Sequence, residues 1–521
     1  MVARAARLPL RNRGAILLIS CYELGHQPLG IAQPLAFLEE AGYQPKALDI
    51  AVTSLDEEAI KEAQFVGISV PMHTALRLGV QVAELVRELN SLCHICFFGL
   101  YASLNAEYLL QHVTDSVIGG EYTAPLVSLV DALEKGGGPE EKEGRLSLRQ
   151  VDGVSTRGRV VNPVLRRSPR TIPAPSRRAL APLGRYAKLE HDGQERLVGY
   201  VEASRGCLHH CLHCPIVPVY QGRLVLVPED SVLEDIRRLV ESGATHMTFG
   251  DPDFLNGPGH SMKILRAMHA EFPRLTFDFT AKIEHLLNRR SLFPELRALG
   301  CLFVVSAVES FSDTVLDRLE KGHTRADVIQ ALGILRPLGI TLRPSLVAFT
   351  PWTTLNDYLE MFEMVVAHDL VDAIDPVQYT IRLLVPPGSA LLQRSDIARF
   401  LSGLDQPSFQ YRWAHPDPCM DRLHERATAA IQEGTRQGQD PLTLFHELRT
   451  QAYRLADRPA PTVSIRHAHD RQKAPRLTEP WFCCAEPTES QLNPLRTTTT
   501  DACDLEPAHP HDEAFNRRKP T

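Results

Sequence analysis

The sequence lacks any apolar run that approaches the roughly 18 residues needed to span a bilayer, so no membrane span is expected. It also lacks a basic stripe, because 56 basic and 63 acidic residues are spread along 521 positions and give a net charge of −7. A nucleic-acid partner is therefore not expected. The start of the chain shows no small-residue cleavage site before folded-looking sequence resumes, which favours a cytoplasmic protein.

A regular set of paired cysteines is missing as well. The eleven cysteines are odd in number and scattered through a large chain. This distribution favours reduced thiols and a metal site over a disulfide framework.

Residues 14–135 alternate short apolar runs, such as AILLIS, AQFVGISV and HICFFG, with amphipathic stretches. Strands alternating with helices predict an α/β fold with a doubly wound parallel sheet of the flavodoxin type. Such sheets bind ligands at the carboxyl ends of their strands. The candidate residues at this edge are Gly67, Ser69, Gly99, Gly119 and Gly120.

The rest of the chain divides by composition. Residues 136–190 are rich in Gly, Pro, Glu, Arg and Ser and predict a linker with a small strand pair. A second alternation over residues 195–400 predicts about six β/α units, which form a partial (β/α) barrel. Residues 401–455 predict a helical region, and residues 456–521 predict a flexible tail.

The segment EASRGCLHHCLHCPI carries Cys207, Cys211 and Cys214 in a C-x3-C-x2-C spacing just after a predicted strand. Three thiolates on one short loop can bind three irons of a [4Fe-4S] cluster and leave the fourth iron open to a substrate. Zinc is the alternative metal. A structural zinc site needs a second ligand pair, however, and the neighbouring histidines lie inside the same loop.

This loop resembles that of the radical S-adenosylmethionine (SAM) superfamily, and the resemblance extends over about residues 195–400. It implies an enzyme in which SAM binds the open iron, and an electron from the cluster breaks a C–S bond of SAM. The strand THMTFGDPDF and the segment VVSAVESFSDTVLDRLEKGHT resemble further family motifs, although Asp251 and Ala307 depart from the usual pattern. The SAM-binding residues that the resemblance implies are His213, Gly250, Asp251, Glu309 and Ser310.

The segments GHQPLGIAQPLAFLEEAGY, VGISVPMHTA and VIGGEYT resemble the cobalamin-binding subfamily of these enzymes. The resemblance implies a corrin on the carboxyl edge of the first sheet, lined by the five candidate residues there. A D-x-H-x-x-G motif is absent, so any cobalamin would be held without a histidine ligand. Such a domain can also keep its sheet without the cofactor, which leaves cobalamin binding open.

The segment EPWFCCAEP contains the adjacent Cys483 and Cys484. It resembles the tail of a group of radical SAM proteins that end in Cys-Cys-Ala-Glu-Pro, some of which carry selenocysteine in the second position. The resemblance implies thiolate chemistry, which makes both cysteines catalytic candidates. The alternative is an apolar anchor in which they pack with Trp481 and Phe482.

The leading hypothesis is a radical SAM enzyme that performs methyl transfer when cobalamin is bound. The second is a cobalamin-free radical SAM enzyme that acts on a sulfur, selenium or arsenic compound through the tail cysteines. The third is a non-catalytic metal-binding scaffold. Both enzymatic hypotheses imply flavodoxin or ferredoxin as the electron donor, and a small molecule or a peptide as the substrate.

Overall fold

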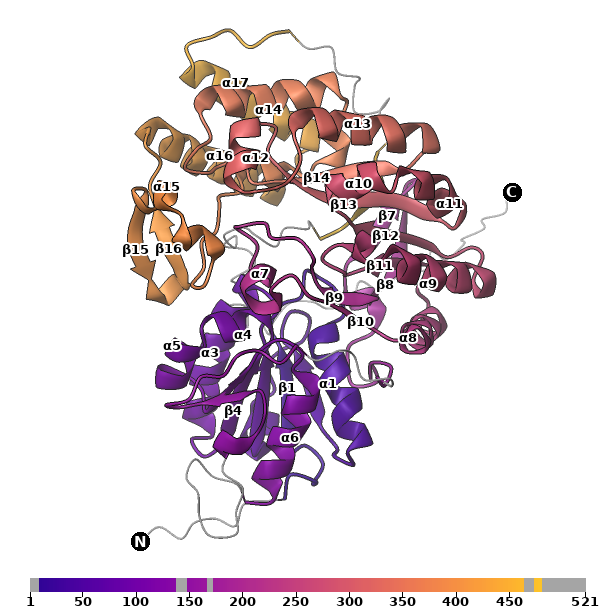
Figure 1. The fold of residues 1–521 in the computed structure, drawn as a ribbon, viewed down its shortest axis with the longest axis vertical. Coiled ribbons are helices and arrows are strands. Elements are labelled where there is room, and N and C mark those ends of the chain that lie inside the picture. Colours follow the sequence, from indigo (N-terminus) through magenta and orange to yellow (C-terminus); the bar gives the residue numbers. More distant parts are fainter. Residues whose placement is uncertain (1–8, 137–147, 166–171, 463–472, 480–521) are drawn as a thin grey trace, which may run out of the picture.

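The structure is a computed structural model that describes residues 9–136, 148–165, 172–462 and 473–479. Two sheets lie one above the other along the long axis of the molecule, and the helices α16 (Pro418–Arg436) and α17 (Pro441–Leu455) lie at the far end of the second sheet (Figure 1). The two sheets, each with flanking helices, confirm the predicted α/β fold class.

The first sheet, here called the amino-terminal sheet, has the strand order β2-β1-β3-β4-β5-β6. Strands β1 to β5 run parallel, and β6 pairs antiparallel with β5. The strands are β1 (Ile16–Ser20), β2 (Lys46–Asp49), β3 (Phe65–Ser69), β4 (His94–Phe98), β5 (Ser116–Ile118) and β6 (Val154–Thr156).

Helices cover both faces of this sheet because successive strand residues point to opposite sides. In β1, Leu17 and Ile19 pack with one set of helices, whereas Ile16 and Leu18 pack with the other. The first set comprises α2 (Glu57–Glu62), α3 (His73–Leu89), α4 (Leu100–Leu104) and α5 (Ala106–His112), and the second comprises α1 (Leu29–Glu40) and α6 (Thr123–Glu134).

The second sheet, here called the half-barrel, has the strand order β14-β13-β12-β11-β8-β7-β17. Five neighbouring strands run parallel, from β8 to β14 along this order, and β7 and β17 extend one edge in antiparallel pairing. The strands are β7 (Lys188–His191), β8 (Gln194–Val201), β11 (His246–Phe249), β12 (Thr276–Thr280), β13 (Cys301–Glu309), β14 (Thr341–Leu346) and β17 (Arg476–Leu477).

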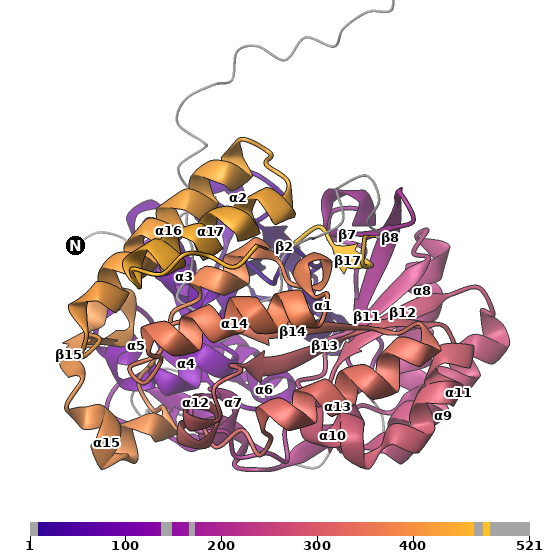
Figure 2. The same cartoon turned by 90° about the horizontal axis from the view of Figure 1, so that it is seen from above.

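Helices connect the parallel strands and cover the outer face of the half-barrel (Figure 2). Helices α13 and α14 both begin with a capping box, Thr324 with Asp327 and Thr354 with Asp357, which satisfies the first backbone N–H groups of each helix. The helices are α8 (Glu229–Glu241), α9 (Pro258–Glu271), α10 (Ile283–Asn288), α11 (Phe293–Ala298), α12 (Asp313–Arg318), α13 (Arg325–Leu335) and α14 (Leu355–Ala367).

Four details differ from the sequence-based expectations. Part of the predicted linker forms β6 and joins the amino-terminal sheet. The expected sixth β/α unit begins as the 3-10 helix η7 (Pro376–Thr380) and pairs with the half-barrel only through the bridge between Phe349 and Arg382. The predicted helical region starts with a hairpin of β15 (Leu401–Asp405) and β16 (Gln410–Trp413). The predicted flexible tail contains β17.

Within the described residues, no helix is both long enough and apolar enough to cross a membrane.

Candidate active site

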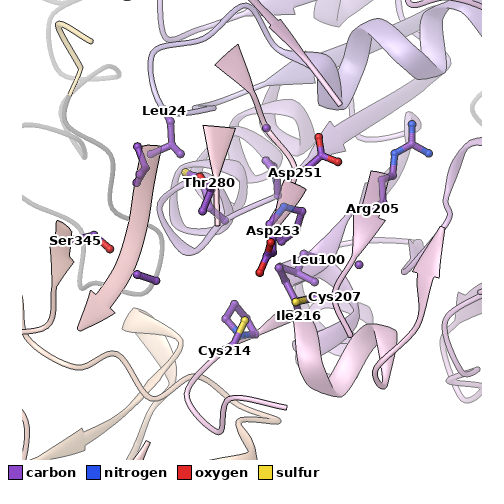
Figure 3. A pocket seen from close by; sticks show the side chains of 18 of the residues that line it. Leu24, Leu100, Arg205, Cys207, Cys214, Ile216, Asp251, Asp253, Thr280 and Ser345 are labelled. Carbon is purple, nitrogen blue, oxygen red and sulfur yellow. The ribbon is translucent and has the colours of Figure 1, made fainter. Parts of the chain in front are cut away.

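The three motif cysteines lie on the loop between β9 (Ser204–Gly206) and α7 (Ile216–Tyr220). Cys207, Cys211 and Cys214 all line one cavity of about 300 Å³, here called the chamber. The chamber is bounded by the half-barrel on one side and by the carboxyl edge of the amino-terminal sheet on the other. Figure 3 shows the sulfur atoms of Cys207 and Cys214 on the same side of the pocket, next to Asp253 in this view.

Buried polar contacts hold the cysteine loop. The carboxylate of Asp253 lies 3.1 Å from Nε2 of His209 and accepts hydrogen bonds from the backbone N–H groups of Leu255 and Lys282. Burial alone would raise the pKa of Asp253, but hydrogen bonds from His209 and His285 lower it. The ionised carboxylate therefore ties the cysteine loop to the ends of β11 and β12.

The donor set of this loop fits a [4Fe-4S] cluster with one open iron. Within the described part of the chain, the chamber is lined by three cysteines and no fourth. The side-chain amide of Asn256 lies 3.4 Å from Sγ of Cys207 and donates to it, the kind of contact that stabilises a thiolate ligand. His209 and His213 also line the chamber, but both belong to the cysteine loop itself, and each lies against a carboxylate, Asp253 or Glu309. They do not form the separate ligand pair that a structural zinc site needs, which disfavours zinc.

Glu309 ends β13 inside the chamber and is flanked by two basic side chains. Its Oε1 lies 3.1 Å from Nε2 of His213 and 3.3 Å from Nζ of Lys321. Burial alone would raise the pKa of Glu309, but Lys321 and His213 lower it to about 2. Its backbone φ of 63° is uncommon outside glycine, and such conformations concentrate at functional sites.

Of the other residues expected to bind SAM, two line the chamber and one does not. Gly250 and Asp251 line the chamber, where a side chain at Gly250 would collide with the Tyr200 hydroxyl. Asp251 accepts hydrogen bonds from Ser204 and from the Ala203 backbone, and burial raises its pKa to about 7. Asp251 therefore anchors the start of the cysteine loop.

Ser310 lies outside the set of described residues that line the chamber, and its hydroxyl accepts a hydrogen bond from the backbone N–H of Ser312. That contact stabilises the turn before α12.

The amino-terminal sheet contributes Ser69, Gly99 and Gly120 to the chamber. Gly67 and Gly119 are not among the described residues that line it. Gly67 lies within β3, where an added Cβ would meet Leu18 and Phe98, and at Gly119 it would meet Ser103. Packing therefore requires both glycines, Gly67 within the sheet and Gly119 against helix α4.

Sequence reasoning missed the contact that joins the two sides of the chamber. The guanidinium of Arg205 lies 3.0 Å from the carboxylate of Glu202 in the half-barrel and 2.9 Å from that of Glu121, which follows β5. Tyr220 also donates to Glu121 at 3.1 Å. The SRG stretch before the first cysteine offered the arginine, but nothing local in the sequence indicated its partner 84 residues earlier.

A second missed group is Glu23, in the loop after β1. Its carboxylate accepts hydrogen bonds from the first backbone N–H groups of α1, at Leu29 and Gly30, and it lines the chamber. Burial raises the pKa of Glu23 to about 8. In the same loop, His26 stacks on Tyr200 of β8 with ring centroids 4.3 Å apart, and burial lowers the pKa of His26 to about 3.

The remaining catalytic candidates, Cys483 and Cys484, lie outside the described residues.

Comparison with known proteins adds to this geometry. Residues 201–365, which include the cysteine loop, Glu309 and Lys321, match the Radical SAM superfamily. The chain contains a radical SAM domain. A radical SAM domain implies a [4Fe-4S] cluster and SAM as its cofactors, and it identifies the chain as an enzyme.

Two relatives carry methyltransferase names. The chain is 25% identical to the hopanoid C-3 methylase of Methylococcus capsulatus over 63% of its own length, and the match spans 62% of that relative. It is 24% identical to an uncharacterized methyltransferase of Pyrococcus horikoshii, over 69% of this chain and 76% of the relative.

Two solved structures share the fold around the radical SAM domain. The cobalamin-dependent SAM radical enzyme OxsB, solved with aqua-cobalamin and SAM bound, aligns with a TM-score of 0.66 and 16% identity over 84% of this chain and 71% of that one. The radical SAM methyltransferase TsrM of Kitasatospora setae aligns with a TM-score of 0.54 and 18% identity over 68% of this chain and 71% of that one.

Proposed function

We propose that this chain is a cobalamin-dependent radical SAM enzyme that transfers a methyl group to a small substrate. One observation carries the proposal: the cluster cysteines and the carboxyl edge of the amino-terminal sheet line the same chamber. The edge of such a sheet is where doubly wound folds bind their ligands. The methyltransferase names of two relatives and the cobalamin bound by OxsB support this assignment.

In this proposal each end of the chamber has its own task. Cys207, Cys211 and Cys214 hold the cluster, and Glu309 accepts hydrogen bonds from the hydroxyl or amine groups of SAM. Lys321 and His213 keep Glu309 ionised and fixed in one orientation. When bound, the cluster supplies the electron that cleaves SAM, and cobalamin supplies the methyl group.

The amino-terminal sheet offers the corrin a surface of small and apolar groups. Ser69 and Gly99 end β3 and β4 at the chamber, and Leu100 and Tyr101 follow directly. Gly99 has a φ of 110°, which lets the backbone turn sharply from strand to helix with no side chain above the edge. The ring of His26 is stacked on that of Tyr200, so we do not assign His26 as a ligand to cobalt.

The direct test is anaerobic reconstitution of the full chain with iron, sulfide and cobalamin, followed by metal analysis and an assay for 5′-deoxyadenosine after reduction in the presence of SAM. The proposal predicts about four irons and about one cobalt per chain, with 5′-deoxyadenosine formed. Four irons with 5′-deoxyadenosine but without cobalt would contradict the cobalamin part alone. Zinc in place of iron would contradict the whole proposal and favour a metal-binding scaffold.

The second candidate is a cobalamin-free enzyme that acts on a sulfur, selenium or arsenic compound through the tail thiols. The adjacent Cys483 and Cys484 favour it, because vicinal thiols bind thiophilic atoms. In that case Cys484→Ala should leave SAM cleavage intact and stop product formation. Unchanged turnover of the true substrate by this variant would exclude the thiol role. In either proposal the enzyme acts in the cytoplasm with flavodoxin or ferredoxin as reductant.

A further inference from the structure

The short segment 473–479 is separated from α17 in the described structure and returns to the half-barrel. It contains β17, which pairs antiparallel with β7 through the partners Arg476–Glu190 and Leu477–Leu189. Thr478 extends the pairing, because its backbone N–H donates to the Lys188 carbonyl at 2.9 Å and its hydroxyl accepts from the Lys188 backbone at 3.0 Å. In Figure 2 β17 lies directly beside β7.

The same segment also contacts the opposite edge of the half-barrel. The side chain of Arg343 in β14 donates to the carbonyl of Pro475 at 3.3 Å and to Asp375 at 2.9 Å. The guanidinium of Arg476 in turn lies 3.9 Å from Asp375. Without β17, the edge strands of this sheet are β7 and β14. Residues 473–479, here called the strap, therefore contact both edges of an otherwise open barrel.

The side chain of Leu477 fills the space between these edges. It packs against an apolar cluster that includes Leu189 of β7 and Phe303 and Val305 of β13. Leu477 lines the chamber, and it also lines a smaller adjoining cavity of about 30 Å³ that shares Val305 and Ser345 with the chamber. The strap thus supplies part of the chamber wall.

The end of the strap reaches the amino-terminal part of the chain. The Tyr22 hydroxyl, just after β1, donates to the carboxylate of Glu479. Gly25 is packed so closely against Glu479 that an added Cβ would lie 2.8 Å from its side chain. Burial raises the pKa of Glu479, and the hydrogen bond from the Tyr22 hydroxyl partly compensates the cost of burying this carboxyl group.

We propose that residues 473–479 are a structural strap that closes the open side of the half-barrel, excludes solvent from the chamber through Leu477 and docks the C-terminal segment against both sheets. The chamber wall is thereby built from the first and the last described parts of the chain.

The test compares three variants of the reconstituted full-length chain. Arg476→Gln removes the ion pair with Glu190 at 2.6 Å, and Leu477→Ala removes the apolar wall. Arg266→Gln is the matched control, because it removes a surface ion pair with Glu295, also at 2.6 Å, far from the strap in sequence.

The first readout is backbone hydrogen exchange of the peptide that contains residues 476–479. The proposal predicts slow exchange in the unaltered chain and exchange at least about tenfold faster in Arg476→Gln, with no change in the control. Rapid exchange in the unaltered chain would overturn the docking of the strap. This readout requires neither cobalamin nor methyl transfer, so it remains informative if the proposed function fails.

The second readout is the rate at which ferricyanide with EDTA bleaches the iron-sulfur absorption. Leu477→Ala and Arg476→Gln should bleach severalfold faster than the unaltered chain, because solvent and oxidant reach the chamber. Arg266→Gln should bleach at the original rate. Equal rates in all four proteins would show that the strap is not a wall of the chamber and would overturn that part of the proposal.

Discussion

The two ends of the chamber are built from different chemistry. At the cluster end, the buried carboxylate of Glu309 lies against two basic side chains, His213 and Lys321. At the other end, the amino-terminal sheet presents apolar side chains, glycine backbone and the carboxyl group of Glu23, whose nearest donors are the N–H groups of α1. The first end is suited to hold charged ligands in fixed positions. The second is suited to accept a large ligand through surface contact.

The largest expected effect is at the cluster end. Cys211→Ala should reduce bound iron from about four atoms per chain to nearly none and abolish formation of 5′-deoxyadenosine. Iron analysis and product chromatography measure both. Cys419→Ala, at a partly exposed cysteine in α16, is the control and should keep both properties. Full iron content in Cys211→Ala would contradict the assignment of the ligands.

The next effect concerns SAM binding at the same end. Glu309→Gln keeps the size of the side chain but removes its charge, so the dissociation constant for SAM should rise on the order of tenfold or more, as expected for a hydrogen bond to a charged group. Equilibrium dialysis with the reconstituted chain measures it.

Iron content should stay unchanged in Glu309→Gln, which separates SAM binding from cluster binding. The matched control is Glu320→Gln, a change to an exposed glutamate that pairs with Arg394. If Glu309→Gln bound SAM as tightly as this control, Glu309 would have no contact with SAM.

The opposite end of the chamber should respond to pH. The pKa of Glu23 rises from its ordinary 4.5 to about 8 in the folded chain. Between these values the folded state binds one more proton than the unfolded state, so this group lowers stability as pH rises from about 5 to about 8. Glu23→Gln removes this loss of stability. Between about pH 5 and pH 8, the melting temperature of the variant should therefore fall by on the order of 3 °C less than that of the unaltered chain.

Calorimetry at several pH values tests this prediction. Glu40→Gln, at an exposed glutamate that ends helix α1, should follow the unaltered chain. Parallel pH profiles for Glu23→Gln and the unaltered chain would contradict the burial of a protonated carboxyl group at this end.

The smallest expected effect tests the contact around the cluster. Asn256→Leu removes a hydrogen-bond donor from the sulfur of Cys207, which destabilises the more negative, reduced cluster. The midpoint potential should fall by on the order of 50 mV, since about 59 mV is a tenfold change for one electron. Redox titration followed by electron paramagnetic resonance measures it. Asn356→Leu, at an exposed site in α14, should leave the potential unchanged.

The comparison also explains what could be predicted from the sequence. The cluster loop was predictable because its three cysteines lie within eight consecutive residues, and the sheets were predictable from alternating apolar runs. The contact of Arg205 with Glu121 was not, because the two residues meet only when the two sheets pack together. Gly67 illustrates the opposite error, since this glycine was expected at a strand end for ligand binding but lies within β3, where it serves packing.

Short or weakly paired elements were the other part of the fold that the sequence did not predict. The strand β17 has two residues and gains its stability from β7 and from Arg343, which are far away in the sequence. The expected sixth β/α unit has alternating apolar residues, but Phe349 provides only two backbone hydrogen bonds to it, with Ile381 and Leu383. In both cases the pairing partner, which periodicity does not reveal, decides the structure.

The central claim is that the cluster and cobalamin occupy one chamber. Electron paramagnetic resonance of the reconstituted chain, with the cluster reduced and cobalamin in its paramagnetic cobalt(II) form, tests it most directly. The account predicts that the two spins interact and that each signal is broadened or split relative to samples with one cofactor alone. Two independent, unperturbed signals, or no retention of cobalamin, would contradict it.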